Sequence, residues 1–193
     1  VDCGCGKAYL TLALSCYLSE ALGMKGVKVI GVDRRADVID SARKMASRLD
    51  LSERAVFVEA DIASYNPEKG EKVNMVVSLH ACDTATDEAL AKAVEWKVEY
   101  VLSVPCCQHE LNKQMSTHNL TLLTRYGIIQ ERFAALLTDS IRANLLEYCG
   151  YKTQLLEFID FAHTPKNILI RAVLKDSQTN ATKEKALNEV KSA

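Results

Sequence analysis

The chain opens with Val1-Asp2-Cys3-Gly4-Cys5-Gly6-Lys7-Ala8, and this stretch decides the fold. A hydrophobic residue, an acid, and two glycines one residue apart, followed by a helical pattern, are typical of a strand that turns sharply into a helix. Gly4 and Gly6 have no Cβ, so the backbone can approach a ligand closely and adopt turn angles closed to other residues. A second apolar run ends at Asp33, whose carboxylate could hold a ribose diol. Together these features predict a nucleoside cofactor across the first two strands.

The spacing of the glycines separates two kinds of cofactor. A dinucleotide fingerprint has the pattern G-x-G-x-x-G, but Tyr9 stands where the third glycine would be. The pattern Asp-x-Gly-x-Gly-x-Ala instead resembles motif I of class I methyltransferases. In that family the acid and the glycine loop hold the methionine end of S-adenosylmethionine. Ala8 replaces a usual glycine, a small-for-small change that we expect to be tolerated. The resemblance implies S-adenosyl-L-methionine as the cofactor.

Apolar runs alternate with helical patterns along most of the chain. Strands are predicted at 1–2, 27–32, 55–59, 73–79, 98–104, 152–159 and 167–174. Helices are predicted at 7–22, 35–49, 84–96 and 128–149. Strands that alternate with helices and end in a hairpin predict an α/β fold, a Rossmann-like doubly wound sheet with an antiparallel last strand. This pattern matches the seven-stranded plan of class I methyltransferases.

Size and composition suit a single domain. With 193 residues, 48% of them hydrophobic, we expect one domain over 1–175 and a polar tail over 176–193 that is a frayed helix or disordered. The net charge of −1 provides no bulk attraction to nucleic acid, although a local basic patch stays possible. No apolar run approaches the ~20 residues that span a bilayer, and no secretory segment is present. We therefore expect a cytoplasmic protein without membrane contact.

The start of the chain is unusual for this fold. Its first residue is not Met, and only Val1 and Asp2 precede the glycine loop to form what should be a central strand. A central strand this short would leave its neighbours unpaired in the middle of the sheet. We expect the first strand to be truncated and the natural N-terminus to lie upstream. The missing region, or a fused domain, would then contribute to substrate binding.

Candidate ligand-binding residues follow the strands, because ligands of such sheets bind outside the carboxyl ends of the parallel strands. The resemblance implies that Asp61, after the third strand, faces the adenine amino group. The alternative is that Asp61 caps a turn, as Asp often does. The predicted cofactor-binding residues are Asp2, Gly4, Gly6, Asp33, Arg34, Asp61, Ile62, Leu79 and His80.

Two further motifs lie at the ends of the fourth and fifth strands. Leu79-His80-Ala81-Cys82-Asp83 and Val104-Pro105-Cys106-Cys107-Gln108-His109-Glu110 together resemble a narrower methyltransferase subgroup. That subgroup includes the glutathione-S-transferase-C-terminal-domain-containing proteins, and more distantly it resembles a family of tRNA ribose 2′-O-methyltransferases. The closing His163-Thr164-Pro165-Lys166-Asn167 is also similar to it. The resemblance implies RNA, tRNA or rRNA, as the favoured acceptor.

The predicted catalytic residues are His80, Asp83, Cys106 and His109. His80, with an ordinary pKa near ~6.5, is a candidate base, and Asp83 could orient or assist it. The alternative is that His80 packs beside the adenine and donates a hydrogen bond. Cys106 could attack a pyrimidine ring as a thiolate, although the Pro-Cys motif expected after the fourth strand of such RNA enzymes is absent. His109 is expected to begin a helix.

Seven cysteines, an odd number without a repeated disulfide spacing, favour reduced thiols. Cys82, Cys106 and Cys107, with His80 or His109, offer ligand-compatible side chains. However, adjacent cysteines without a second matched pair are a weak zinc signature, so no metal site is predicted. Small thiols that line a pocket are the favoured interpretation.

Three functions are compatible with these patterns. The leading hypothesis is an S-adenosylmethionine-dependent methyltransferase with an unknown acceptor, RNA being favoured. The second is a degenerate methyltransferase fold that serves as a regulatory or assembly module. The third, an NAD-dependent oxidoreductase, is disfavoured by Tyr9.

Overall fold

The computed structural model describes residues 1–79, 81–114, 121–160, 164, 167–175, 186–188 and 190–191. Within these residues seven strands are present: β1 (Asp2–Cys3), β2 (Val29–Asp33), β3 (Ala55–Glu59), β4 (Met75–Leu79), β5 (Tyr100–Val104), β6 (Tyr151–Glu157) and β7 (Ile168–Leu174). The helices of the same residues are α1 (Tyr9–Cys16), α2 (Ala36–Arg48), α3 (Thr84–Glu95), α4 (His109–Gln114), α5 (Thr121–Thr124) and α6 (Gly127–Tyr148).

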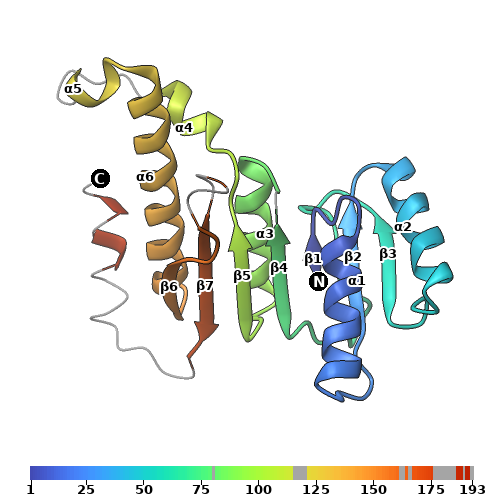
Figure 1. Cartoon of the computed structure of the whole chain (residues 1–193). Coiled ribbons are helices and arrows are strands. Elements are labelled where there is room, and N and C mark those ends of the chain that lie inside the picture. The colour runs from blue at the N-terminus through green and yellow to red at the C-terminus, as the bar shows by residue number, and fades with distance from the viewer. Residues whose placement is uncertain are drawn as a thin grey trace.

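The strands form one sheet in the order β3-β2-β1-β4-β5-β7-β6 (Figure 1). Strands β1 to β5 run parallel. Strand β7 runs antiparallel to both of its neighbours, β5 and β6. The predicted fold, a doubly wound α/β sheet of seven strands with an antiparallel last strand, is confirmed.

Strand β1 is short but lies at the centre of the sheet. It pairs with β2 on one side and with β4 on the other. The Val1 carbonyl extends this pairing by accepting a hydrogen bond from the Val77 amide at 2.8 Å. The central position of β1 is therefore as the sequence predicts, and despite its length β1 pairs with both neighbours.

Two core clusters cover opposite ends of the sheet. One joins α1 and α2 to β3 through residues such as Leu12, Ile39 and Phe57. The other joins α3 and α6 to β4, β5 and β7 through residues such as Leu90, Leu146 and Ile170. Figure 1 shows α1 in front of the sheet and α3 behind it. Both faces are thus covered, which explains why β2 is a continuous apolar run.

The first helix is shorter than predicted. A single helix over 7–22 is expected from the apolar spacing, but α1 begins at Tyr9 because Ala8 has a positive φ of 65°. After Cys16 the chain continues as a π-helical turn over Tyr17–Ala21. The helical pattern is correct, whereas its first residues belong to the loop that contacts the pocket.

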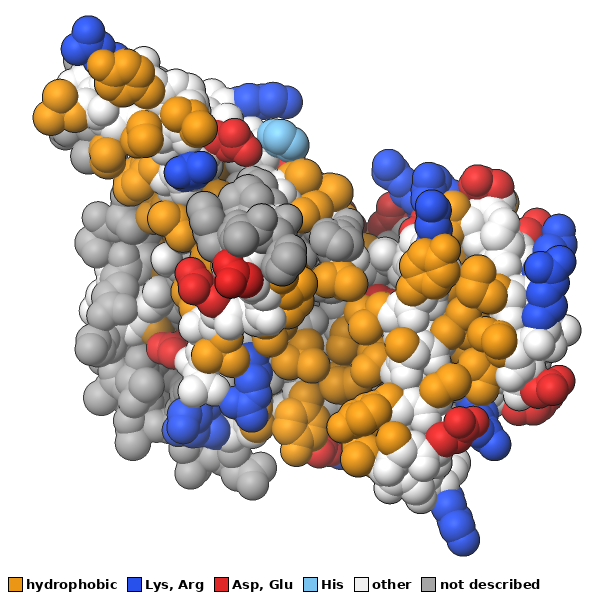
Figure 2. Space-filling model, in the orientation of Figure 1, with side chains coloured by type: hydrophobic (Ala, Val, Ile, Leu, Met, Phe, Trp, Pro, Cys, Tyr) orange, Lys and Arg blue, Asp and Glu red, His pale blue; other side chains and the backbone are white. Residues whose placement is uncertain are grey.

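The far end of the molecule is apolar on its surface. Leu122, Tyr126 and Ile128 are 84%, 58% and 61% exposed, and Figure 2 shows hydrophobic side chains over the end where α5 meets α6. In the predicted tail, residues 186–188 and 190–191 are helical, and Ala186 is buried. None of the helices in the described ranges combines the length and the hydropathy needed to cross a bilayer.

Candidate functional site

A pocket of about 740 Å³ lies at the carboxyl ends of the parallel strands. This volume is within the ~300–1,000 Å³ of typical ligand sites. Eight predicted cofactor-binding residues line it: Asp2, Gly4, Gly6, Asp33, Arg34, Asp61, Ile62 and Leu79. The ninth, His80, lies outside the described residues. The chain thus brings the predicted residues of four strand ends to one cavity.

The glycine loop is bent by left-handed backbone conformations. Gly4 and Gly6 have φ angles of 75° and 48°, which favour glycine. The amides of Gly4 and Cys5 both donate to the Val32 carbonyl, at 2.8 and 3.0 Å. A Cβ on Gly4 would lie 3.4 Å from the Cβ of Ala81, so the loop also packs closely against the segment after β4. The loop is therefore held by backbone contacts.

Ala8 occupies the place of a third glycine and adopts the conformation a glycine would have. Its φ is 65° and it is completely buried. An L-residue in this region costs roughly 1–2 kcal/mol. The methyl group packs in the core cluster with Leu12 and Ile39, and this packing offsets part of the strain. The small side chain is consequently accommodated without opening the loop.

Asp33 joins the end of β2 to the glycine loop. Its Oδ2 accepts a hydrogen bond from the Gly6 amide at 3.1 Å, and its Oδ1 accepts one from the Arg35 amide at 3.0 Å. A carboxylate has about four acceptor positions. Two are used by the backbone, so the other two can accept the hydroxyls of a ribose diol. Asp33 therefore combines a structural role with the capacity for the predicted ligand contact.

Asp2 is a buried carboxylate at the base of the pocket. It is 1% exposed, and its Oδ2 accepts a hydrogen bond from the Thr11 hydroxyl at 2.6 Å. Burial raises the pKa of Asp2 to about 6, and the Asp33 carboxylate adds to this rise while the Thr11 hydrogen bond opposes it. Burial thus destabilises the charged form. A cationic group entering the pocket would stabilise that charge.

Asp61 has the contacts of a turn and also a place in the pocket. Its Oδ1 accepts a hydrogen bond from the Ala63 amide at 3.0 Å, so the turn-capping alternative is present. Its exposed side chain also lines the cavity, next to the largely buried Ile62. The two interpretations are compatible, and contact with adenine stays a prediction.

Gly31 lies within β2, outside the pocket lining, and the sequence analysis missed its role in supporting the glycine loop. A Cβ there would lie 2.8 Å from Cδ1 of Phe57 and 3.0 Å from the Cβ of Cys5. The absent side chain thus lets Cys5 and the Phe57 ring both approach β2. A glycine inside an otherwise apolar strand was the available signal, because such glycines often mark close approaches.

Three thiols lie close together in the segments after β4 and β5, and of these Cys82 lines the pocket. The pairing of Leu79 with Val104 places the segments after β4 and β5 side by side. The Sγ atoms of Cys82 and Cys106 are 3.2 Å apart, those of Cys106 and Cys107 3.6 Å, and those of Cys107 and Cys82 3.8 Å. Burial, with the neighbouring thiols, raises the pKa of Cys106 to about 12. Without a bound metal, the Cys106 side chain is therefore a protonated thiol at neutral pH. Protonation works against the predicted nucleophilic role of Cys106.

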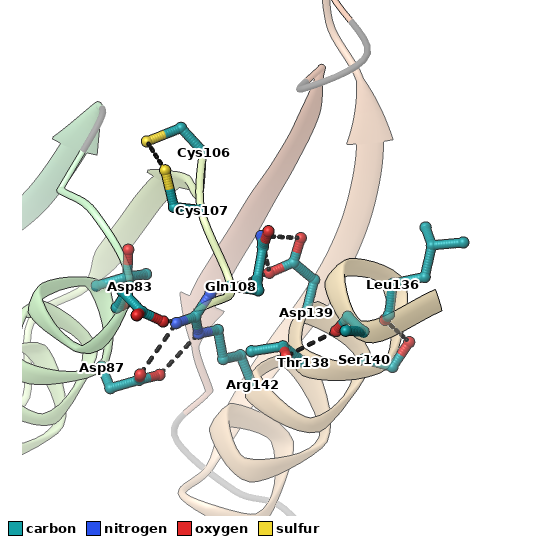
Figure 3. Close-up of polar contacts among 12 residues, drawn as sticks. Asp83, Asp87, Cys106, Cys107, Gln108, Leu136, Thr138, Asp139, Ser140 and Arg142 are labelled. Carbon is teal, nitrogen blue, oxygen red and sulfur yellow. Dashed lines mark hydrogen bonds and ion pairs between the residues drawn. The ribbon is translucent and has the colours of Figure 1, made fainter. Parts of the chain in front are cut away.

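Arg142 of α6 ties together the segments around the thiols (Figure 3). It is buried and donates from Nε and Nη2 to the Asp87 carboxylate of α3, at 2.7 and 2.9 Å. Its Nη1 donates to Asp139 at 3.1 Å, and its Nη2 also donates to the Asp83 carbonyl at 3.0 Å. Gln108 donates from Nε2 to both Asp139 oxygens at 3.3 Å. One guanidinium thus connects α3, α6 and the loop after β4, and Asp139 extends the network to the loop after β5.

The sequence analysis missed Arg142, Asp87 and Asp139. A signal was present, because Asp139 and Arg142 are three residues apart in a helix whose neighbouring positions Ala143 and Leu146 are apolar. Charged residues on a buried helix face require partners. Which partners they have depends on how α6 packs.

The predicted catalytic residues have different surroundings. Asp83 accepts a hydrogen bond from the Glu110 amide at 3.2 Å, so its described contact supports the start of α4. His109 is exposed and is the first residue of α4, where a helix start is predicted. His80 and His163 lie outside the described residues. The catalytic roles of His80, Asp83, Cys106 and His109 stay predictions.

Comparison with known proteins identifies relatives of this architecture. A family model described as "Methyltransferase domain" matches residues 1–114. No curated protein matches the chain.

Several solved structures have a similar fold. A candidate rRNA methylase from Clostridium thermocellum is 18% identical with a TM-score of 0.59, covering 92% of this chain and 86% of that protein. An rRNA methylase from Streptococcus thermophilus is 14% identical with a TM-score of 0.55, covering 90% and 86%. The S-adenosylhomocysteine-bound methyltransferase PaMTH1 of Podospora anserina is 12% identical with a TM-score of 0.54, covering 91% and 70%. At these identities the likeness concerns the fold.

Proposed function

Because the chain belongs to the methyltransferase domain family, we propose that it transfers the methyl group of S-adenosylmethionine to RNA, with the cofactor bound over Gly4 and Gly6. The enzyme class and the cofactor predicted from the sequence are confirmed by the family. The acceptor and the roles of individual residues are the proposal. The observation that supports the binding mode best is the Asp33 carboxylate, which is joined to the glycine loop at 3.1 Å within the pocket.

Each part of the cofactor has a matching group in the pocket. The bent backbone at Gly4 and Gly6 leaves room for the methionine end, and the buried Asp2 carboxylate pairs with its ammonium group. The two remaining acceptor positions of Asp33 take the ribose hydroxyls. Asp61 and Ile62 lie at the next strand end, where the adenine would lie. These assignments use polar groups at positions that the fold places around one cavity.

Methyl transfer depends mainly on how the enzyme positions the acceptor atom relative to the methyl group. The acceptor atom attacks the methyl carbon, the carbon–sulfur bond breaks, and its electron pair returns to sulfur to leave a neutral thioether. For such an in-line displacement, orientation supplies much of the acceleration. A base is needed only if the acceptor must lose a proton, and His80 is the proposed base, with Asp83 as its orienting partner.

RNA is favoured as acceptor by cations at the pocket and by the relatives. The lining of the pocket includes the exposed cations Lys7, Arg34 and Arg35. It also includes four acids, Asp2, Asp33, Asp61 and Glu88, so RNA is favoured by the exposed cations and not by the net charge of the pocket. Figure 2 shows Lys and Arg side chains gathered at the edge beside α2. Cations at this edge suit contact with phosphates. Two proteins of similar fold are described as rRNA methylases, one of them a candidate.

Two measurements test this function. Calorimetry with S-adenosylhomocysteine should give a saturable signal, and no binding would favour the degenerate binding module. Tritium transfer from labelled S-adenosylmethionine to RNA and protein fractions of methyl-starved cells should then give a product sensitive to ribonuclease. Label found only in protein would contradict the RNA acceptor.

The base is tested separately from the acceptor. His80→Ala should lower turnover more than cofactor affinity if His80 removes a proton from the acceptor. A loss of S-adenosylhomocysteine affinity with little change in turnover at saturating cofactor would instead show that His80 packs on the adenine.

A further inference from the structure

The three thiols after β4 and β5 form a compact triangle. The Sγ atoms of Cys82, Cys106 and Cys107 are separated by 3.2, 3.6 and 3.8 Å. Within the described residues, they form a group of three side chains whose ligand atoms lie close enough to share one metal ion. A disulfide would join two of these sulfurs and leave the third, whereas a cation can contact all three.

The size of the triangle matches a thiolate-bound metal. Zinc–sulfur bonds of about 2.3 Å in a tetrahedral site place the sulfurs about 3.8 Å apart. Two edges of the triangle, at 3.6 and 3.8 Å, are close to this separation. The third, at 3.2 Å, requires an outward shift of a few tenths of an ångström. Rotation about the Cα–Cβ bond of Cys82, which is exposed, can supply that shift.

The segments that present the thiols are fixed by the Arg142 network. Arg142 donates to the Asp83 carbonyl, one residue after Cys82, at 3.0 Å. Gln108, one residue after Cys107, donates to Asp139, and Asp139 also accepts from Arg142. Figure 3 shows Cys106 and Cys107 above this set of contacts. Outer contacts that orient the segments bearing metal ligands are a regular feature of metal sites.

We propose that Cys82, Cys106 and Cys107 bind one zinc ion at the edge of the cofactor pocket. On binding, each thiol releases its proton to solvent, and the three thiolates with Zn²⁺ form a centre of net charge −1. Thiolates select zinc among the abundant divalent metals, and a tetrahedral zinc keeps a fourth position for another ligand. Cys82 itself lines the pocket, so the ion would lie beside the bound cofactor. Metal binding does not depend on the acceptor of the methyl group.

Metal analysis of the whole chain tests the site directly. Protein purified under reducing conditions with zinc should contain about one zinc per chain by mass spectrometry. Cys82→Ser, Cys106→Ser and Cys107→Ser should each weaken zinc binding by more than the roughly 10–100-fold typical of losing an outer contact. Cys149→Ser is the matched control, because that thiol is exposed at the end of α6, and it should leave zinc binding unchanged.

Cobalt substitution identifies the ligands. Wild-type protein loaded with Co²⁺ should show near-ultraviolet thiolate-to-cobalt charge-transfer bands, and X-ray absorption of the zinc form should give about three sulfur ligands. Each of the three serine variants should weaken these bands, while thermal unfolding checks that the variants are folded. Absence of metal in reduced wild-type protein, or equal zinc content in the Cys106→Ser variant, would overturn the proposal. S-adenosylhomocysteine binding is measured separately, so a negative result for zinc would not by itself contradict the proposed methyl transfer.

Discussion

The two sides of the pocket are built in different ways. On the glycine side, the loop at residues 4–6 is held by backbone hydrogen bonds to Val32 and by the Asp33 carboxylate at the adjacent strand end. On the cysteine side, the loops are held by a buried guanidinium that reaches residues 55 and 59 positions away in the chain. The first side depends on residue types at strand ends, and the second on how distant helices pack.

This difference determines how each side of the pocket responds to amino-acid substitutions. Backbone hydrogen bonds persist when most side chains are replaced, provided that the left-handed glycines are kept. A buried ionic network behaves differently, since removing one member leaves another charge buried without compensation. Variants on the two sides should therefore differ in both size and kind of effect.

The largest effect is expected at Arg142. Arg142→Ala should lower the free energy of unfolding by roughly 3–5 kcal/mol, because the buried Asp139 loses its charged partner. Urea unfolding measures this. Arg132→Ala, an exposed residue of the same helix, is the control and should change stability by at most about 0.5 kcal/mol. If both variants behaved alike, the network would not stabilise the cysteine side.

Asp2 should make stability depend on pH. Its pKa is about 6 in the folded protein against an ordinary 3.8, so the folded state binds the proton more tightly. The contribution of Asp2 to the free energy of unfolding should therefore fall as pH rises from 3.8 to about 6, by roughly 3 kcal/mol in total. Asp2→Asn keeps an acceptor for Thr11 and should remove this fall.

Urea unfolding of wild type and Asp2→Asn between about pH 4 and 8 tests the pH dependence. Asp37→Asn, an exposed acid of α2, should retain the wild-type profile. A difference between wild type and Asp2→Asn that is constant across this range would contradict the burial effect.

Asp33 tests the glycine side. Asp33→Ala should weaken S-adenosylhomocysteine binding by roughly 1–3 kcal/mol, from the loss of buried hydrogen bonds to the ribose. Asp37→Ala, four residues later and outside the pocket, is the calorimetric control. Equal affinity of the Asp33 variant and wild type would refute the assignment of the ribose contact.

Ala8 should give the smallest effect. Ala8→Gly relieves the backbone strain of an alanine with a positive φ, but it removes a buried methyl group and increases the conformational entropy of the unfolded chain. Because these effects oppose one another, the free energy of unfolding should change by no more than about 1 kcal/mol. Ala89→Gly is the control, because Ala89 is equally buried within α3. That variant should lose about 1 kcal/mol or more. A large loss of stability in the Ala8→Gly variant would mean that packing of the methyl group, rather than the backbone conformation of residue 8, stabilises the loop.

The alternation of strands and helices, the antiparallel last strand and the position of the pocket could be predicted from the sequence. Apolar runs, two glycines and acids at strand ends are local signals, and the rule that ligands bind at the carboxyl ends of parallel strands converts them into a cavity. The lining of that cavity by Asp2, Asp33 and Asp61 follows from the same signals. The exact start of α1 did not follow, because the left-handed Ala8 looks helical in a pattern of residue types.

The amino-acid sequence by itself determined the fold, the family and the bend of the glycine loop, because these depend on periodicity and on residue types that few alternatives can replace. Only the tertiary structure decided that Gly31 admits the Phe57 ring, that Arg142 joins two loops, and that three thiols meet. Such contacts join residues far apart in the chain. Burial makes an unpaired charged group costly, and packing selects which partner each one has.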